Sequence, residues 1–182
     1  HPYLTERKLT AESIQWFGLG VAGKGSMKDR VAIPIHNAGG EVVAYAGRWT
    51  GSDATLPEKE GKYKLPAGFH KSLVVYNLNR VASDAKRVII VEGFWSVFWL
   101  HQNGFPNVVS VMGSSISPQQ VELLAQRFKG VQILFDGDTA GKTGADSVAA
   151  GLVRQLWVRV VDCPEGKQPD QLPADELKQL LS

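Results

Sequence analysis

The second half of the chain alternates between short apolar runs and segments with helical periodicity. The runs are strand-sized and rich in Val and Ile, and they lie at residues 87–93, 107–113, 131–136 and 158–163. Helix-like segments lie at residues 94–104, 117–130, 142–156 and 174–181. One of these has Ser117 in position to cap it, Pro118 at its first turn and Gly130 at its end. Strands alternating with amphipathic helices predict crossover connections and an α/β fold, with a parallel sheet flanked by helices.

The first half shows a different pattern, in which apolar and polar residues alternate over two neighbouring runs. Residues 30–37 and 41–49 are typical of two strands joined around Gly39 and Gly40 as a β-hairpin. Polar and basic side chains interrupt this region, and they are Arg30, Arg48, Lys62, Lys64, His70 and Lys71. We therefore expect a small basic α+β subdomain over residues 1–84 and an α/β domain over residues 85–182.

The composition excludes several classes of protein. With 182 residues, 43% of them hydrophobic, the chain is long enough to bury a substantial core. Its apolar stretches are too short for a membrane span or a signal peptide, so we expect a cytoplasmic protein with no membrane partner. The single cysteine, Cys163, excludes an internal disulfide and a zinc ribbon. The first residue is His1 rather than Met, so we expect either a piece of a longer protein or a remnant of a tag.

Charge is distributed unevenly along the chain, although the net charge is only +2. Residues 1–90 contain 13 Lys and Arg against 8 Asp and Glu, or +5, and residues 91–182 contain 7 against 10, or −3. A basic first part beside an acidic second part suits an enzyme that handles a polyanion and holds a cation. Solvated surface faces produce the same asymmetry, so charge alone does not decide between the two.

Carboxylates follow the ends of three predicted strands. Glu92 closes the first strand, Asp136 and Asp138 close the third, and Asp162 and Asp170 follow the fourth. Because parallel strands end at one edge of their sheet, we expect these acids to gather there, where open α/β folds bind ligands.

Gathered carboxylates repel one another unless a cation neutralises them. A hard divalent ion, Mg²⁺ (or Mn²⁺), fits, because it takes oxygen ligands and completes its coordination shell with water and phosphate oxygens. The alternative is that Asp136 and Asp138 only cap the helix that follows. Gly137 and Gly141 would let the backbone turn tightly and leave room for a ligand.

Three segments resemble the Toprim domain, which primases, topoisomerases and some nucleases share. They are "VIIVEGFWSV", "VVSVMGSS" and "ILFDGDTAGKTGA", in that order on a β-α-β-α-β frame. The preceding segments narrow the resemblance to the catalytic core of bacterial DnaG-type primases. These are "YLTERKLTAESIQWFGLG", "DRVAIPIHNAGGEVVAYAGRW" and "GKYKLPAGFHKSLVVYNLNRV". The resemblance covers nearly the whole chain.

The resemblance implies a primase that makes RNA primers on a single-stranded DNA template by nucleotidyl transfer from ribonucleoside triphosphates. It implies catalytic and metal-binding roles for Glu92, Asp136 and Asp138, with Asp170 as a further metal ligand. By the same resemblance, nucleotide or nucleic-acid contacts fall to Arg30, Arg48, Lys62, Tyr63 and Lys71. Ser114 and Ser115 would add hydroxyl or backbone contacts, although a loop that needs small residues explains them equally well. A replicative helicase is the further implied partner, through domains outside this chain.

The chain departs from the family pattern at two positions. Ser96 and Gln168 stand where such primases usually carry acids. We therefore expect one metal site built on Glu92, Asp136 and Asp138, and fewer bound ions than in a fully acidic relative. A divergent primase-like protein of a mobile element fits these departures as well as a host replicative primase does.

Two other functional classes stay open from the sequence. A Toprim-type nuclease or strand-passing enzyme would use similar acids to cleave phosphodiester bonds. However, the primase-like first half argues against it, and no tyrosine is marked as a nucleophile. A non-catalytic module would bind nucleic acid or nucleotides through its basic face. Metal-dependent incorporation of labelled ribonucleotides separates the three.

Overall fold

The protein is represented by a computed structural model that describes residues 1–52, 55–56 and 61–182. The chain divides into two compact units. Unit 1 comprises residues 1–36 and 41–69, and unit 2 comprises residues 37–40 and 70–182. Each unit has its own four-stranded sheet, antiparallel in unit 1 and parallel in unit 2.

Unit 1 combines short helices with the antiparallel sheet. Its helices are α1 (Pro2–Glu6), α2 (Ala11–Phe17) and the 3-10 turn η1 (Gly25–Met27). Its strands are β1 (Gly20–Val21), β2 (Arg30–His36), β3 (Val42–Trp49) and β4 (Tyr63–Lys64), which lie in that order across the sheet. The expected hairpin is confirmed, because β2 pairs antiparallel with β3 and Gly40 turns between them with a φ of 90°.

Helix α2 begins and ends where local chemistry dictates. Its N-cap is Thr10, whose hydroxyl accepts a hydrogen bond from the Ser13 N–H at 3.2 Å. Gly18 ends the helix in the left-handed conformation, with a φ of 65°. Phe17 of this helix and Ile33 of β2 are both fully buried, so the helices and the sheet both contribute side chains to the interior of unit 1.

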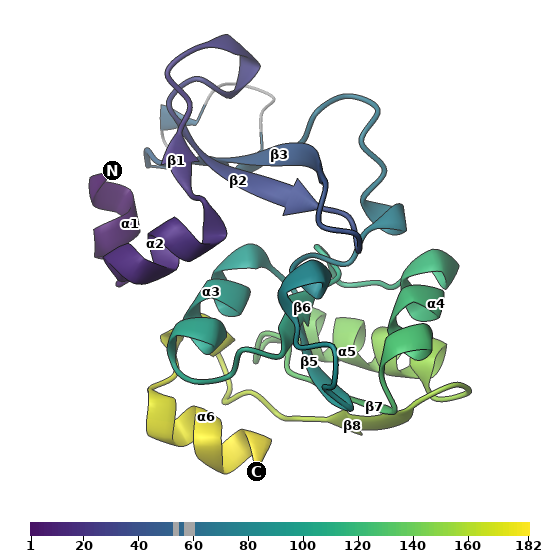
Figure 1. Cartoon of the computed structure of the whole chain (residues 1–182). Helices are drawn as coiled ribbons and strands as arrows, with labels where there is room; N and C mark the ends of the chain where they lie inside the picture. The colour runs from purple at the N-terminus through teal and green to yellow at the C-terminus, as the bar shows by residue number, and fades with distance from the viewer. Residues whose placement is uncertain (53–54, 57–60) are drawn as a thin grey trace. The chain divides into compact units, whose positions relative to one another are not determined.

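Unit 2 is built on the predicted parallel sheet, with its strands in the order β6-β5-β7-β8. The strands are β5 (Arg87–Val91), β6 (Val108–Ser110), β7 (Gly130–Ile133) and β8 (Trp157–Val160). The helices between and after them are α3 (Phe94–Gln102), α4 (Pro118–Arg127), α5 (Thr139–Leu152) and α6 (Ala174–Leu181). Within this unit α4 packs beside α5, and α3 contacts β6 and the turn η5 (Pro169–Gln171) (Figure 1). The α/β architecture expected from the sequence is thus confirmed.

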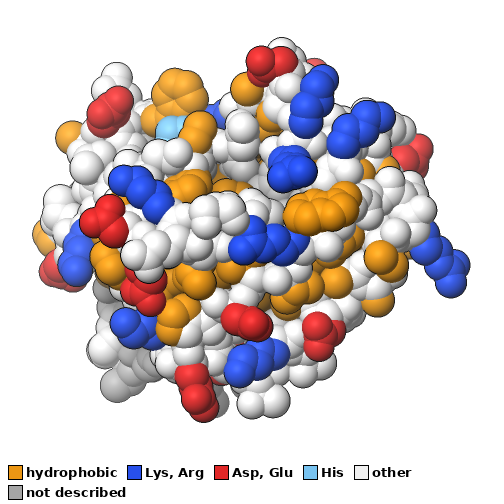
Figure 2. All heavy atoms as spheres, turned by 90° about the horizontal axis from the view of Figure 1, so that it is seen from below, with side chains coloured by type: hydrophobic (Ala, Val, Ile, Leu, Met, Phe, Trp, Pro, Cys, Tyr) orange, Lys and Arg blue, Asp and Glu red, His pale blue; other side chains and the backbone are white. Residues whose placement is uncertain are grey.

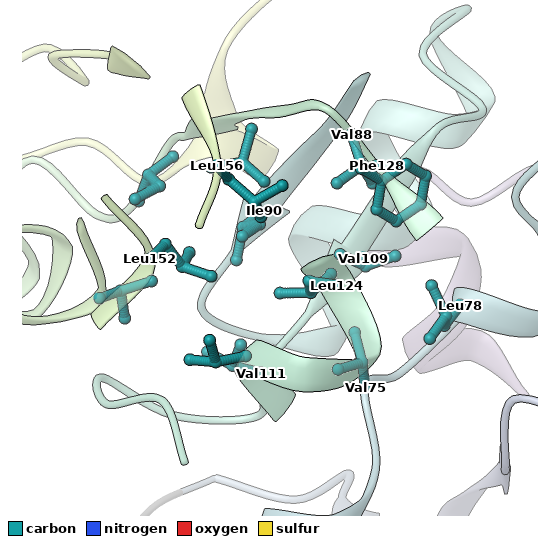
Figure 3. Packing of buried hydrophobic residues seen from close by; sticks show 14 of the residues in the cluster. Val75, Leu78, Val88, Ile90, Val109, Val111, Leu124, Phe128, Leu152 and Leu156 are labelled. Carbon is teal, nitrogen blue, oxygen red and sulfur yellow. The ribbon is translucent and has the colours of Figure 1, made fainter. Parts of the chain in front are cut away.

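The core of unit 2 explains why β5 is an uninterrupted apolar run. Val88 and Ile90 pack into a large cluster with α4 and α5, while Ile89 and Val91 are also buried. Figure 3 shows Ile90, Val109 and Leu124 within this cluster. Because β5 is covered on both faces, its four apolar side chains from Val88 to Val91 are all buried, and burial of each large apolar side chain contributes about 1.5–3 kcal/mol.

Residues 70–84 pack with unit 2, although the sequence analysis grouped them with the basic part. They include the 3-10 turns η3 (Lys71–Leu73) and η4 (Leu78–Arg80). Val75 and Leu78 belong to the apolar cluster of unit 2, and Tyr76 exchanges backbone hydrogen bonds of 2.8 and 3.1 Å with Ser110. The packing boundary therefore precedes residue 70, whereas the sequence analysis expected the boundary after residue 84.

Helix α5 starts earlier than its sequence pattern indicated. It begins at Thr139 rather than Lys142, because the side chain of Asp138 caps it. The small residues between the two positions hid the helical pattern, since they contribute little hydrophobic periodicity. With 14 residues, α5 is the longest helix described, and none of the described helices has the length and apolar character needed to cross a membrane.

Candidate active site

The strand order of unit 2 reverses direction at β5, which creates a topological switch point at the carboxyl edge of its sheet. From β5 the chain crosses to β6 on one side, and it then returns past β5 to form β7 and β8 on the other. The loops that leave β5 and β7 therefore diverge, and ligands of open α/β sheets bind at such a point. Glu92 follows β5 and Asp136 follows β7, so each acid leaves one of these two strands.

Four carboxylates interact at this edge. The pKa of Glu92 is raised by burial first, and then by the negative charges of Asp136 and Asp138. The pKa of Asp136 is also raised, mainly by burial, with added repulsion from Asp170 and Asp138. These acids follow different strands in the sequence, and in the structure they lie close enough to influence one another's pKa. We call Glu92, Asp136, Asp138 and Asp170 the acidic cluster.

Gln168 is the neutral member of this neighbourhood. Its Nε2 donates a hydrogen bond of 2.7 Å to Oδ2 of Asp136, and this bond lowers the pKa of Asp136 against the effects that raise it. The position predicted to have lost an acid therefore carries a donor that partly compensates the charge of Asp136. Ser96, the other such position, is buried in α3.

Asp138 has a structural role as well. Its Oδ1 accepts a hydrogen bond of 2.7 Å from the backbone N–H of Gly141, which makes it the N-cap of α5. The capping interpretation of the sequence is correct for Asp138, but it does not exclude the other role. Asp138 is exposed and acts electrostatically on both Glu92 and Asp136.

The two glycines of this loop allow close packing of the backbone and do not leave space for a ligand. A Cβ on Gly137 would lie 2.0 Å from the carbonyl oxygen of Pro164, and one on Gly141 would lie 2.1 Å from that of Asp136. The expectation that they leave room for a ligand is therefore wrong. Instead, Gly137 lets the loop that carries Asp136 pack against the loop that leads to Asp170, and Gly141 lets the first turn of α5 pack against the backbone of Asp136.

The donor set fits a hard divalent cation, because all four members of the acidic cluster offer carboxylate oxygens. Their mutual repulsion is what a bound cation would remove. Among the residues that the structure describes, no group of three or more His, Cys, Asp and Glu side chains is already arranged to hold a metal ion.

Lys71 is placed beside the same edge of unit 2. Its Nζ donates a hydrogen bond of 3.1 Å to the carbonyl oxygen of Met112, in the loop that follows β6. The next residue in that loop, Gly113, donates its N–H to the carbonyl oxygen of Glu92 at 3.0 Å. Lys71 and Glu92, which the sequence treated as separate candidates, are thus linked through two residues of one loop.

Ser114 and Ser115 are both exposed, beyond this loop. Ser114 lines an open hollow together with Thr139, Thr143 and Ser147 of α5. A Cβ on Gly144 would lie 2.9 Å from the Cβ of Ser114, so the two backbones approach closely. This geometry agrees with the alternative that a small residue is needed at Ser114.

Arg30 has a structural role in unit 1. It is only 1% exposed, and its Nη1 donates hydrogen bonds to the carbonyl oxygens of Gly47, Gly61 and Lys62 at 3.2, 3.2 and 3.3 Å. Its guanidinium also lies over the ring of Trp49, 5.4 Å from the centroid. Arg30 therefore ties residues 61–62 to the sheet, and a direct phosphate contact stays a prediction.

Arg48 lies between two tyrosines of unit 1. Its Nε donates a hydrogen bond of 2.9 Å to the hydroxyl of Tyr3, and its guanidinium lies 5.2 Å from the ring centroid of Tyr63. The structure thus brings together Arg48 and Tyr63, two of the predicted binding residues, and Lys62 is exposed next to them. Sequence reasoning missed Tyr3, because nothing in its neighbourhood shows that it contacts a residue 45 positions away.

Comparison with known proteins relates this chain to the Toprim domain family and to bacterial DNA primases. Residues 86–162 match the Toprim domain family. The DNA primase of Synechococcus elongatus is 34% identical over 188 residues, which covers 92% of this chain and 26% of that primase. The crystal structure of the zinc-binding and RNA polymerase domains of the Aquifex aeolicus primase has a TM-score of 0.88 at 26% identity, and the match covers 99% of this chain and 54% of that one. The chain carries a Toprim domain of the DnaG primase type.

The Toprim domain accounts for the sheet of unit 2, since residues 86–162 extend from the start of β5 to the loop after β8. Asp170, η5 and α6 follow it. A DnaG primase catalytic domain bound to single-stranded DNA has the same fold, with a TM-score of 0.84 at 24% identity over 99% of this chain and 69% of that one. The chain spans about a quarter of the length of the curated primases that it matches, with values from 22% to 26%.

Proposed function

We propose that this chain is a catalytic core segment of a DNA primase, which makes RNA primers on single-stranded DNA by nucleotidyl transfer from ribonucleoside triphosphates. The observation that carries the proposal is the acidic cluster at the switch point of the Toprim sheet. The first half of the chain supports it, because the similarity to the Aquifex primase covers 99% of this chain rather than the Toprim domain alone.

In this proposal Glu92, Asp136 and Asp138 hold a divalent cation, Mg²⁺ or Mn²⁺, and Asp170 assists. The cation, when bound, would lower the pKa of the attacking hydroxyl and stabilise charge on the transferring phosphate. Among the chain's own residues, the pKa values of Glu92 and Asp136 are raised mainly by burial and further by neighbouring carboxylates, and the repulsion between these carboxylates supports the assignment, because a bound cation would offset it. The Asp138 cap fixes the loop between β7 and α5, and so orients Asp136.

The basic residues would hold phosphates. The planar guanidinium of Arg48 can donate two hydrogen bonds to one phosphate, and the two tyrosine rings restrict its orientation. Lys62 and Tyr63 lie near it, so we assign this group to single-stranded DNA or to the triphosphate. A DnaG catalytic domain of the same fold is known bound to single-stranded DNA, which supports the assignment. A replicative helicase remains a predicted partner, which would bind through domains outside this chain.

The test is incorporation of labelled ribonucleotides by the 182-residue chain on single-stranded DNA with Mg²⁺ or Mn²⁺. We expect slow synthesis at high protein and template concentrations, because a primase must collect two nucleotides and a flexible template. The Aquifex structure includes a zinc-binding domain, for which this chain, with one cysteine, has no ligand set. Supplying that domain in trans should therefore raise the rate.

Glu92→Gln should abolish incorporation, whereas Asp175→Asn, which removes an exposed carboxylate on α6, should not change it. Undiminished synthesis by Glu92→Gln would overturn the proposal. Cleavage of the template in place of synthesis would assign the acidic cluster to a nuclease. Binding of DNA without either reaction would leave a non-catalytic module.

A further inference from the structure

A buried hydroxyl lies directly behind Glu92. Ser110, the last residue of β6, is 0% exposed, and its Oγ donates a hydrogen bond of 2.7 Å to the carbonyl oxygen of Glu92. The same Oγ accepts a hydrogen bond of 2.8 Å from the backbone N–H of Met112. One side chain therefore connects the end of β5 with the loop that follows β6, and both of its hydrogen-bonding functions are used.

The connection lies where the ladder between the two strands stops. Val91 and Ser110 are the last paired residues of β5 and β6, so the sheet itself does not fix Glu92 from this side. Beyond that pair, the carbonyl of Glu92 accepts from the Ser110 hydroxyl and from the Gly113 N–H. These two hydrogen bonds fix the main chain of Glu92 at the point where the pairing of β5 with β6 has ended.

The loop that makes these bonds has an unusual backbone. Met112 has a φ of 58°, in the left-handed region that a long L side chain rarely adopts. Such a conformation persists only where its surroundings hold it, and here the Ser110 hydroxyl holds the Met112 N–H while Lys71 Nζ holds the Met112 carbonyl. Without these bonds the loop would relax, and Gly113 would release Glu92.

Glu92 needs such support, because its neighbours in the acidic cluster repel it. The carboxylates of Asp136 and Asp138 act on the carboxylate of Glu92, and this repulsion favours conformations in which Glu92 turns away. A ligand whose main chain is fixed loses less freedom when it closes on a cation, and so it binds more tightly.

We propose that Ser110 is a positioning residue, whose buried hydroxyl holds the main chain of Glu92 so that its carboxylate meets those of Asp136 and Asp138 around one divalent cation. Lys71 supports the same loop through Met112. The inference rests on the proposed function, because it gives Glu92 the role of a metal ligand.

The experiment is titration of the full 182-residue chain with Mn²⁺ alone, followed by calorimetry and by the electron paramagnetic resonance of free Mn²⁺. Ser110→Ala should weaken Mn²⁺ binding about 10-fold, the lower end of what loss of an outer hydrogen bond costs at metal sites. Ser110→Cys is slightly larger and keeps a donor, although a weaker one, so its affinity should lie between those of Ser110→Ala and the wild type.

The matched control is Val88→Ala, at the other end of β5. Val88 is 1% exposed and belongs to the apolar cluster, so its truncation lowers stability without touching the loop of residues 110–113. Its Mn²⁺ affinity should equal that of the wild type. A merely structural role for Ser110 would make Ser110→Ala behave like Val88→Ala, and that result would overturn the inference.

The outcomes separate this inference from the proposed function. If Glu92→Gln abolishes Mn²⁺ binding and both Ser110 variants bind as tightly as the wild type, the inference fails and the metal site stands. If Glu92→Gln binds Mn²⁺ as the wild type does, the proposed function fails at its metal site. If only one Ser110 variant folds, its affinity relative to Val88→Ala still decides.

Discussion

Nε2 of Gln168 lies 2.7 Å from Oδ2 of Asp136 and donates a hydrogen bond to it. The amide is neutral and binds the Asp136 carboxylate, whereas an acid at position 168 would repel it. The bond also connects the loop after β7 with the turn η5, which carries Asp170. The geometry gives a physical reason to expect few bound cations, because the amide partly satisfies Asp136 before any cation arrives.

Gln168→Asp should make the fold more dependent on divalent cations. The change removes the donor to Asp136 and adds a negative charge beside it, so the variant should melt at a lower temperature than the wild type in EDTA. Saturating Mn²⁺ should restore the loss and give a larger metal-dependent rise in Tm. Differential scanning fluorimetry with and without Mn²⁺ measures both. Gln155→Asp, at an exposed position after α5, should leave the metal-dependent rise unchanged.

Neutralising the acidic cluster should stabilise the protein when no cation is present. Glu92 and Asp136 have raised pKa values, so each binds its proton more tightly in the folded than in the unfolded state. Ionisation above the ordinary pKa values of 4.5 and 3.8 therefore costs stability, and this loss is present at neutral pH.

In EDTA at pH 7.5, Asp136→Asn should consequently melt above the wild type, and the difference should shrink as the pH falls toward 4. Thermal melts across this range, with Asp175→Asn as the exposed control, measure the effect. A lower Tm for Asp136→Asn at neutral pH would show that the carboxylate is satisfied within the fold rather than repelled.

Cys163 should react slowly with thiol reagents. Burial, with a contribution from the negative charge of Asp136, raises the pKa of this thiol from 9.0 to about 11. At pH 8 a shift of that size lowers the thiolate fraction about 100-fold, and the thiolate is the reactive form. Labelling by a chromogenic disulfide should thus be at least that much slower in the native chain than in urea. Equal rates would mean that the segment around Cys163 opens readily.

Arg30 and Arg48 should respond differently to truncation. Arg30→Ala leaves three carbonyl groups of unit 1 without this donor, so we expect a loss of about 2–4 kcal/mol in the free energy of unfolding. Urea denaturation monitored by tryptophan fluorescence measures it, since Trp49 lies against Arg30.

Arg48→Ala should change stability less and DNA affinity more. It should flatten the slope of log affinity against log salt by about 0.7, the value for one lost phosphate contact on a single strand. Lys178→Ala on α6 is the control for removal of an exposed positive charge. A slope unchanged by Arg48→Ala would leave Arg48 with its two tyrosine contacts as its only role.

The sequence predicted the parallel sheet and the edge at which its acids meet, because both depend on local signals. Val and Ile in β5 have the pattern of a strand buried on both faces, and Glu92 directly follows that strand. Asp138 could be predicted both as a cap and as a candidate ligand, since a short acidic side chain before a helix has both chemistries.

The contacts of Arg30 and Ser110 could not be predicted in the same way. Arg30 is buried because residues 61–62 return to cover it, and no periodicity encodes that return. Ser110 looks like any small residue in a strand, and its role depends on the Glu92 carbonyl 18 positions earlier in the chain. Both roles arise from tertiary hydrogen bonds, which a pattern of hydrophobic and polar positions does not record.

Figure 2 shows hydrophobic side chains exposed between Lys and Arg side chains on the face seen from below. Exposed apolar residues of unit 2 include Val153, Trp157 and Val160, and the last two belong to the edge strand β8. The guanidinium of Arg87 lies 4.8 Å from the ring centroid of Trp157. This positive charge covers part of the apolar surface at the edge of the sheet.

The central place of β5 in its sheet sets an order for synthesis on the ribosome. Both partners of β5 come later in the chain, and the second, β7, ends at Ile133, which is 133 − 91 = 42 residues after Val91. At about 5–20 residues per second, the apolar run of β5 would wait roughly 2–8 seconds after its own synthesis before its second partner has been made. During that interval the nascent chain contains an apolar strand without its second partner, which makes this segment accessible to a chaperone that recognises short apolar stretches.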